Sequence, residues 1–227
     1  MWYSVTGMQA YEFTLNGARL AALASGALWW PDARLLCVSD LHFGKSGRQS
    51  RRNGALLPPY ETRETLARLE RDILEQKPAI VVALGDSFDD VAAAGEMAVD
   101  EHRWLSRLMA GRRWVWIEGN HDPGPLGVGG SHLNKLRVTP LAYRHIAAPD
   151  GKGEISGHYH PKISVKTDLR RVARPCFLLD ENRVILPAFG TYTGGLRSDN
   201  AALQALMRAD AVALLTGRQI LAVPMNH

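Results

Sequence analysis

Short apolar runs and longer amphipathic stretches alternate along the first half of the chain. Residues 35–39, 80–84 and 114–117 are apolar runs of strand length, and each leads into a loop with polar residues. Between them, residues 62–76 and 97–109 carry apolar side chains at the spacing of a helix. This alternation predicts a mainly parallel sheet with crossover helices, whose loops meet at the carboxyl edge of the sheet.

The helical spacing also indicates which face of each stretch is buried. The apolar face of residues 62–76 consists of Leu66, Leu69, Ile73 and Leu74. The corresponding face of residues 97–109 consists of Trp104, Leu105 and Leu108. A late helix is expected at residues 201–207.

The second half of the chain changes character, because its apolar segments are short and are separated by turn residues. Candidate strands occupy residues 141–146, 154–156, 163–167, 176–179 and 183–186. Short strands that follow one another in this way are typical of antiparallel pairing. Together, the two halves predict an α/β fold with two sheets packed face to face and helices outside.

Composition favours one folded domain that spans residues 1–227. With 46% hydrophobic residues, a chain of this length can bury a substantial core. The apolar stretch 20–30 is broken by Ser25 and Gly26 and is shorter than the ~20 residues of a membrane-spanning helix. The first ten residues lack the features of a secretory signal. We therefore expect a cytoplasmic protein without a membrane segment, in which Cys37 and Cys176 are reduced core thiols.

Two of the expected strands lead directly into acidic residues. Asp40-Leu41-His42 follows the first strand, so its carboxylate and imidazole could share a metal ion. Gly85-Asp86 follows the second strand, where the glycine permits a tight turn and the carboxylate could bridge two cations. Taken singly, each motif is better explained by an ordinary turn.

Two further motifs follow along the chain. In the segment 119–122, the amide oxygen of Asn120 could be a neutral metal ligand, while His121 could donate a proton and be held by Asp122. In the segment 157–160, His158 and His160 lie on the same side of an extended chain, where they could reach adjacent metal ions. A polar loop and hydrogen-bonded structural histidines are the alternatives for these motifs taken one at a time.

The four motifs together, in the order D-x-H, G-D, G-N-H-D and G-H-x-H, resemble the calcineurin-like metallophosphoesterase superfamily. The resemblance implies a four-layer α-β-β-α sandwich and a centre with two divalent metal ions. It assigns Asp40, His42 and His160 to one metal ion. It assigns Asn120 and His158 to the other, with Asp86 as the ligand that both share.

The superfamily pattern contains another histidine before its last motif, and the chain offers His132 and His145 for this role. We expect the ligand to be His145, because it follows the apolar segment 141–143 and stands a short loop before the last motif. His132 ends the glycine-rich stretch 127–132, so a structural or surface role is expected for it.

Segments outside the four motifs are similar to the bacterial ligase-associated DNA-damage-response endonucleases, the PdeM-like group. They comprise residues 41–45, 57–59, 61, 65–66, 158–161, 175–177, 186–190 and 194–195. This resemblance implies manganese-dependent cleavage of DNA and a functional association with a DNA ligase and a helicase. Iron or zinc would also suit the mixed ligands. The chain departs from the group at Asp89 and Asp90, where a histidine is more common, and the departure could change substrate preference.

Basic residues cluster directly after the first motif, at Lys45, Arg48, Arg51 and Arg52. The formal charge of the chain is +4, which permits an anionic partner without requiring one. Beside a metal site such a cluster could contact DNA phosphates, whereas elsewhere it would be an ordinary solvated loop. The sequence therefore favours a DNA endonuclease or phosphodiesterase in DNA repair. The alternatives are a phosphatase or small-molecule phosphodiesterase and a metal-free scaffold, and the complete set of ligand motifs argues against the scaffold.

Overall fold

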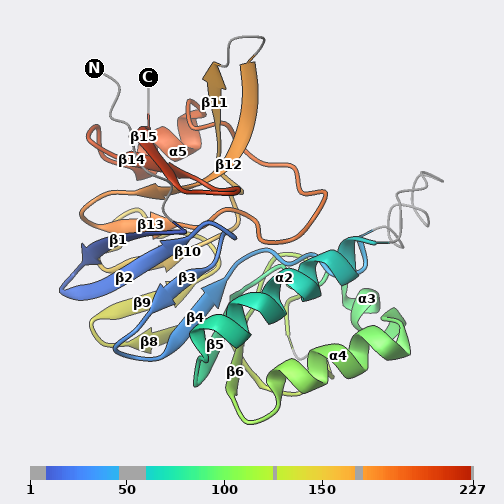
Figure 1. The fold of residues 1–227 in the computed structure, drawn as a ribbon. Coiled ribbons are helices and arrows are strands. Elements are labelled where there is room, and N and C mark those ends of the chain that lie inside the picture. The colour runs from blue at the N-terminus through green and yellow to red at the C-terminus, as the bar shows by residue number, and fades with distance from the viewer. Residues whose placement is uncertain (1–8, 46–59, 125–126, 167–170, 226–227) are drawn as a thin grey trace.

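Two β-sheets lie face to face, and helices cover their outer faces, in the computed structural model of the protein (Figure 1). The structure describes residues 9–45, 60–124, 127–166 and 171–225. The four layers confirm the α-β-β-α sandwich that the resemblance implied. Among the described residues, no helix is both long enough and apolar enough to cross a membrane.

The first sheet has seven strands, which follow one another in chain order across the sheet. They are β1 (Ala10–Leu15), β2 (Ala18–Leu23), β3 (Leu28–Trp30), β4 (Leu35–Val38), β5 (Ile80–Leu84), β6 (Arg113–Ile117) and β7 (Ser131–Leu133). From β4 to β6 the pairing is parallel, as the alternation of strands and helices predicted. The sequence pattern did not predict β7, which is parallel to β6. The three strands before β4 pair antiparallel, and the sequence pattern did not predict them.

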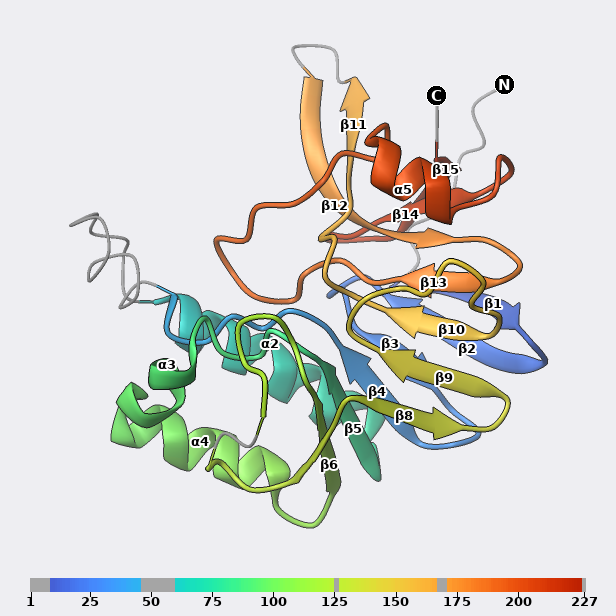
Figure 2. The ribbon, with the colours of Figure 1, turned by 180° about the vertical axis from the view of Figure 1, so that it is seen from behind.

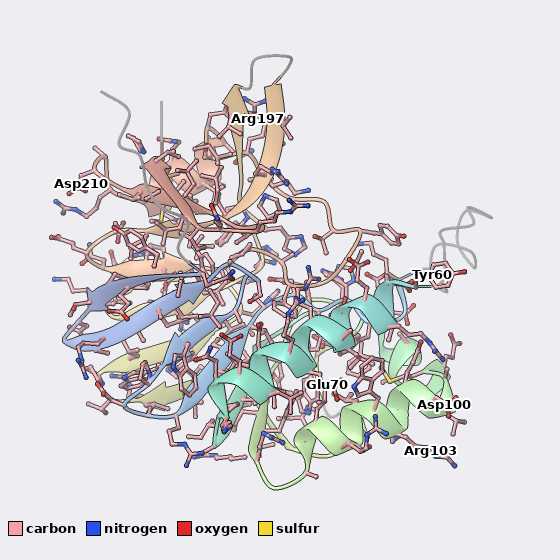
Figure 3. All side chains as sticks on the ribbon, viewed as in Figure 1. Tyr60, Glu70, Asp100, Arg103, Arg197 and Asp210 are labelled. Atoms are coloured by element: carbon pink, nitrogen blue, oxygen red, sulfur yellow. The ribbon has the colours of Figure 1, made fainter. Side chains whose placement is uncertain are left out.

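Three helices lie on the outer side of the first sheet, as Figure 2 shows from behind. They are α2 (Glu61–Gln76), α3 (Val91–Glu96) and α4 (Val99–Met109). In α2, Leu66, Leu69 and Ile73 are buried as expected, but Leu74 is 66% exposed. Successive helical residues are ~100° apart, so Leu74 turns away from the face on which Ile73 lies. On α4, Asp100 and Arg103 lie on the outside of the molecule (Figure 3).

The second sheet has eight strands, and one further helix packs on its outer side. The elements are β8 (Lys135–Val138), β9 (Leu141–Arg144), β10 (Glu154–Ser156), β11 (Lys162–Lys166), β12 (Arg171–Leu179), β13 (Arg183–Ile185), α5 (Ala201–Leu206), β14 (Val212–Leu215) and β15 (Leu221–Pro224). Most neighbours pair antiparallel, but β10 is parallel to both β9 and β13, which corrects the expectation for this half. Parallel neighbours need a connection that returns the chain to the starting end of the first strand. Between β9 and β10, residues 145–153 make this return without a helix.

Alternate residues of the central strands face two different cores. In β4, Leu35 and Cys37 pack between the sheets, whereas Leu36 and Val38 pack against the helices. Because both faces are buried, these strands are continuous apolar runs, and their polar continuations emerge only at the carboxyl edge. Cys37 is a buried free thiol, and burial raises its pKa well above the usual value. Cys176 is likewise buried and free.

Candidate metal centre

The loops that follow β4 and β5 are joined along their backbones. Asp40 and His42 donate backbone hydrogen bonds to the carbonyl oxygens of Gly85 and Asp86, at 3.2 and 3.0 Å. Farther along, the backbone of Asp89 donates to the carbonyl of Phe43 at 3.0 Å. The D-x-H and G-D motifs, which are far apart in sequence, therefore form one framework at the carboxyl edge of the first sheet.

The carboxylates of this framework hold the other two loops. Asp86 Oδ1 accepts a hydrogen bond from the backbone N–H of His121 at 2.8 Å. Asp40 Oδ2 accepts one from the backbone N–H of His158 at 2.9 Å. Each aspartate thus uses one oxygen to fix a neighbouring loop and leaves the other for an imidazole or a cation.

Glycines permit this close approach. A Cβ atom on Gly157 would lie 1.7 Å from Ser39 Oγ, so no other residue fits between this loop and β4 without displacing them. Gly85 has a φ of +77°, and a Cβ atom there would lie 2.6 Å from His145 Nδ1. These two motif positions therefore require glycine because a side chain would collide with a neighbouring residue, and not only because the chain turns there.

Five of the expected ligands adopt left-handed backbone conformations. They are Asp40, His42, Asp86, His158 and His160, with φ between 46° and 70°. This region is uncommon for residues other than glycine and costs on the order of 1–3 kcal/mol, so it persists only where the surroundings impose it. Its occurrence at five chemically related positions marks the edge of the sheets as a functional site.

The first group of close donor atoms consists of Asp40, His42 and His160, whose potential ligand atoms all lie within 4.8 Å of one another. His160 Nε2 is 3.0 Å from Asp40 Oδ1 and 3.5 Å from His42 Nε2. Asp40 Oδ1 is buried and, among the described residues, has no partner with hydrogen-bond geometry. A buried carboxylate oxygen that lies close to imidazole nitrogens fits a cation.

The second group consists of Asp86, His145 and His158, again within 4.8 Å of one another. His145 Nε2 is 3.4 Å from Asp86 Oδ2 and 3.1 Å from His158 Nδ1. The two groups are adjacent, because the backbone of His158 is bonded to the Asp40 carboxylate of the first group. Mixed carboxylate and imidazole donors of this kind suit manganese, iron or zinc.

Two histidines have their tautomer determined by a second partner. His42 Nδ1 lies 2.9 Å from Asp89 Oδ1, and His145 Nδ1 lies 2.7 Å from the carbonyl oxygen of Leu84. An ionised carboxylate and a carbonyl can only accept, so each Nδ1 donates its proton. The Nε2 atom of each ring is then directed toward its donor group, which is how metal-binding imidazoles are commonly oriented.

The surroundings shift the pKa values of the aspartates and of two histidines in these groups. Burial by itself would raise the pKa of Asp40 and of Asp86. Hydrogen bonds and charges of neighbouring histidines outweigh burial and lower both pKa values. Burial acts in the opposite direction on His145, but Asp86 and Asp40 outweigh it and raise the pKa of this imidazole. Burial and the charge of His145 lower the pKa of His158. At neutral pH the two carboxylates are therefore ionised and able to bind a cation.

The structure corrects the expected role of Asp122. Its carboxylate accepts hydrogen bonds from the backbone N–H groups of Asp86 and Ser87, at 2.9 and 2.8 Å, and so supports the G-D loop rather than holding His121. His121 Nδ1 instead lies 2.8 Å from the carbonyl oxygen of Asp89. Burial and the charge of Asp86 raise the pKa of Asp122 to about 6, although backbone donors act against them.

The remaining expected site residues are members of neither donor group. Asn120 is exposed and lines the same cavity as His145, directly before the backbone bond from His121 to Asp86. His132 lies in β7, stacked on Trp116 with ring centroids 6.5 Å apart, and is in neither donor group. Lys45 Nζ lies 3.9 Å from Asp89 Oδ1 at the edge of the centre. The other members of the basic cluster, Arg48, Arg51 and Arg52, lie outside the described residues.

Asp89 is the site residue whose role was missed in the sequence. It is 1% exposed, its side chain orients His42, and its carbonyl accepts from His121. A second acidic residue three positions after Asp86 was a usable signal, because the bend after Gly85 turns that position back toward the D-x-H loop.

Comparison with known proteins agrees with this geometry. The family model for calcineurin-like phosphoesterases matches residues 33–184. The crystal structure of Pseudomonas putida nuclease MPE superimposes with a TM-score of 0.77 and 28% identity, covering 94% of this chain and 100% of that one. This likeness to a nuclease agrees with the narrower resemblance seen in the sequence.

Two other proteins are more distant. A probable inactive purple acid phosphatase 14 of Arabidopsis thaliana is 29% identical over 125 residues, which are 52% of this chain and 30% of that protein, so the chain matches less than a third of its length. Yfce, a phosphoesterase from E. coli, has 14% identity and a TM-score of 0.40, over 85% of this chain and 99% of that one. The family match spans more than half of the chain and includes all four motifs, so this protein belongs to the calcineurin-like phosphoesterase family.

Proposed function

We propose that this protein is a phosphodiesterase that depends on two divalent metal ions and acts as a DNA endonuclease. Its family supports a metallophosphoesterase activity. The observation that carries the proposed two-metal chemistry is the pair of adjacent donor groups, one with Asp40 and one with Asp86, joined through the backbone of His158.

The proposed ligands divide between two sites. Asp40, His42 and His160 hold one metal ion. His145, His158 and Asn120 hold the other, and Asp86 is shared. Manganese is the proposed metal, and iron and zinc are compatible with the same donors.

When bound, the two metal ions supply charge neutralisation of the phosphate and a water nucleophile that is active at neutral pH. The alkoxide that leaves a DNA sugar also needs a proton. In this proposal the proton comes from Nε2 of His121, while Nδ1 donates to the carbonyl of Asp89. This requires the doubly protonated ring.

DNA as the substrate is supported by the likeness to a nuclease over 94% of the chain. The basic cluster that begins at Lys45 would supply phosphate contacts beside the centre. A role in DNA repair, in functional association with a DNA ligase and a helicase, rests on the sequence resemblance. A cytoplasmic location accords with two buried free thiols.

Circular single-stranded DNA is the substrate that tests this function, because an exonuclease has no end at which to begin. We expect the manganese-reconstituted protein to convert the circle to linear strands, as resolved on a denaturing gel. Asp86→Ala should leave the circle intact, whereas Asp100→Ala, on the exposed side of α4, should cleave it like the wild type.

Two model substrates distinguish the alternatives in the same experiment. An intact circle together with rapid hydrolysis of p-nitrophenyl phosphate, a monoester, would establish a phosphatase instead. Hydrolysis of bis(p-nitrophenyl) phosphate without DNA cleavage would indicate a phosphodiesterase for small molecules. If no phosphate ester is hydrolysed with manganese, iron or zinc, the scaffold alternative gains support.

A further inference from the structure

A cavity of ≈ 440 Å³ adjoins the candidate metal centre on the side of β6, β8 and β9. His145 belongs to both the cavity and the second donor group, and the proposed ligand Asn120 also lines the cavity. Its volume lies within the ~300–1,000 Å³ that small-molecule sites occupy. A ligand in this cavity would therefore reach the residues around the second metal position while extending away from them.

Two cationic side chains line one wall of the cavity. Lys135 at the start of β8 and Arg144 at the end of β9 are directly opposite each other in the antiparallel register. Opposite residues of such a pair project from the same face of the sheet. Lys135 is exposed, and Arg144 is half-buried, with Nη1 3.5 Å from Glu154 Oε2.

The acidic groups near this wall do not cancel its charge. Glu154 is buried and is also 3.5 Å from Arg183, so its carboxylate is shared between two guanidinium groups. Glu118 lines the cavity and is exposed, which leaves two cations against one carboxylate in the lining. An anion is favoured here, and multiple contacts to phosphates are the usual source of affinity for nucleic acid.

The same lining includes an apolar contact. Ile146 directly follows His145 and is 43% exposed, although it is a large aliphatic residue beside a polar centre. Asn134, directly before β8, adds an amide to the lining. Cationic, amide and aliphatic groups together match a nucleotide, which has a phosphate, polar base edges and an apolar sugar and base face.

We propose that this cavity binds the nucleotide that flanks the scissile phosphate of a nucleic acid strand. Lys135 and Arg144 contact the phosphate of this nucleotide, and Ile146 packs against its sugar and base. The inference rests on the proposed phosphodiesterase function. It adds a path for the strand, from the metal centre across the ends of β8 and β9.

Binding of a fluorescein-labelled single-stranded oligonucleotide tests this path, with chelator present to prevent cleavage. Fluorescence anisotropy at several salt concentrations gives both the affinity and its salt dependence. Lys135→Glu should weaken binding about tenfold at low salt and reduce the salt slope by about one, because a phosphate contact is lost. Ile146→Ser should weaken binding with an unchanged slope, because it removes an apolar contact.

Lys152→Glu is the matched control. It makes the same change of charge at an exposed lysine, on the loop that enters β10 at the end opposite to His158. Equal losses of affinity for Lys135→Glu and Lys152→Glu would show only a general effect of charge and would overturn the proposal. No loss for either cavity variant, or no binding by the wild type, would also overturn it.

A second measurement separates this inference from the proposed function. The oligonucleotide should inhibit hydrolysis of bis(p-nitrophenyl) phosphate by the manganese-loaded wild type, with a higher inhibition constant for Lys135→Glu. If the wild type hydrolyses no diester, the proposed function fails. If it hydrolyses the diester and both proteins have the same inhibition constant, only the nucleotide site fails.

Discussion

The carboxylate of Asp89 lies 2.9 Å from Nδ1 of His42, and both side chains are almost completely buried. The carboxylate can only accept, so His42 directs Nε2 toward Asp40 and His160. Asp89 is therefore a positioning residue for a proposed metal ligand.

Asp89→Ala should reduce the affinity for manganese about 10–100-fold, because partners of metal-binding histidines typically have effects of this size. Asp89→Asn should reduce the affinity for manganese less, since its amide oxygen can still accept a hydrogen bond from His42. Isothermal titration with manganese measures the effect independently of turnover. Asp90→Asn is a suitable control, because asparagine can cap α3 as aspartate does. Unchanged manganese affinity in Asp89→Ala would contradict a positioning role.

Asp86→Ala should remove the proposed shared ligand and the backbone anchor of His121 together. We expect the purified variant to bind less than one metal ion per chain and to have no detectable diesterase activity. Metal analysis after gel filtration, alongside turnover, checks this outcome. Near-normal turnover with two bound metal ions would exclude the shared role.

His121→Ala should retain its metal ions and slow the cleavage of DNA by about 10²–10⁴-fold, the usual contribution of a general acid. The defect should shrink with bis(p-nitrophenyl) phosphate, whose leaving group departs without a proton. Turnover of both substrates at matched metal occupancy makes the comparison. Loss of metal, or equal slowing of both substrates, would instead make His121 a ligand or a positioning group.

Asp72 should make the stability of the protein depend on pH. This α2 carboxyl is 4% exposed, and burial raises its pKa from 3.8 to about 6. The unfolded chain ionises first as pH rises from about 4 to 6, so the free energy of unfolding falls across this window and then stays constant.

Replacing Asp72 by asparagine should remove that decline. The free energy of unfolding of Asp72→Asn relative to wild type should rise by up to about 3 kcal/mol between pH 4 and pH 7.5, at 1.36 kcal/mol per pKa unit. Urea unfolding at the two pH values measures the difference. Asp100→Asn, at an exposed position, should show no such trend, and a parallel pH profile for Asp72→Asn and wild type would refute the prediction.

Much of the fold could be predicted because local patterning carries the required information. The strands around Cys37, Val82 and Val115 are buried on both faces, so they are continuous apolar runs that end where the chain reaches solvent. The strands β1 to β3 were missed, because polar and small residues interrupt the pattern of β1 and β2 and because β3 is only three residues long. Their antiparallel pairing, one strand after another onto β4, makes them part of the sheet. The three residues of β10 likewise do not determine that it is parallel to β9. The path of the preceding connection, residues 145–153, determines it.

By itself, the sequence determined where chemistry-bearing residues occur, since glycines and polar residues interrupt apolar strands at Asp40, Asp86 and His158. Only the tertiary structure decided which of these residues are partners. Asp122 is next to His121 in the chain, yet its carboxylate bonds to the backbone of the Asp86 loop, while Asp89 reaches both His42 and His121. Neighbours in a loop need not face each other, because the left-handed turns at the ligands redirect each side chain, and the backbone bonds that impose those turns come from other loops.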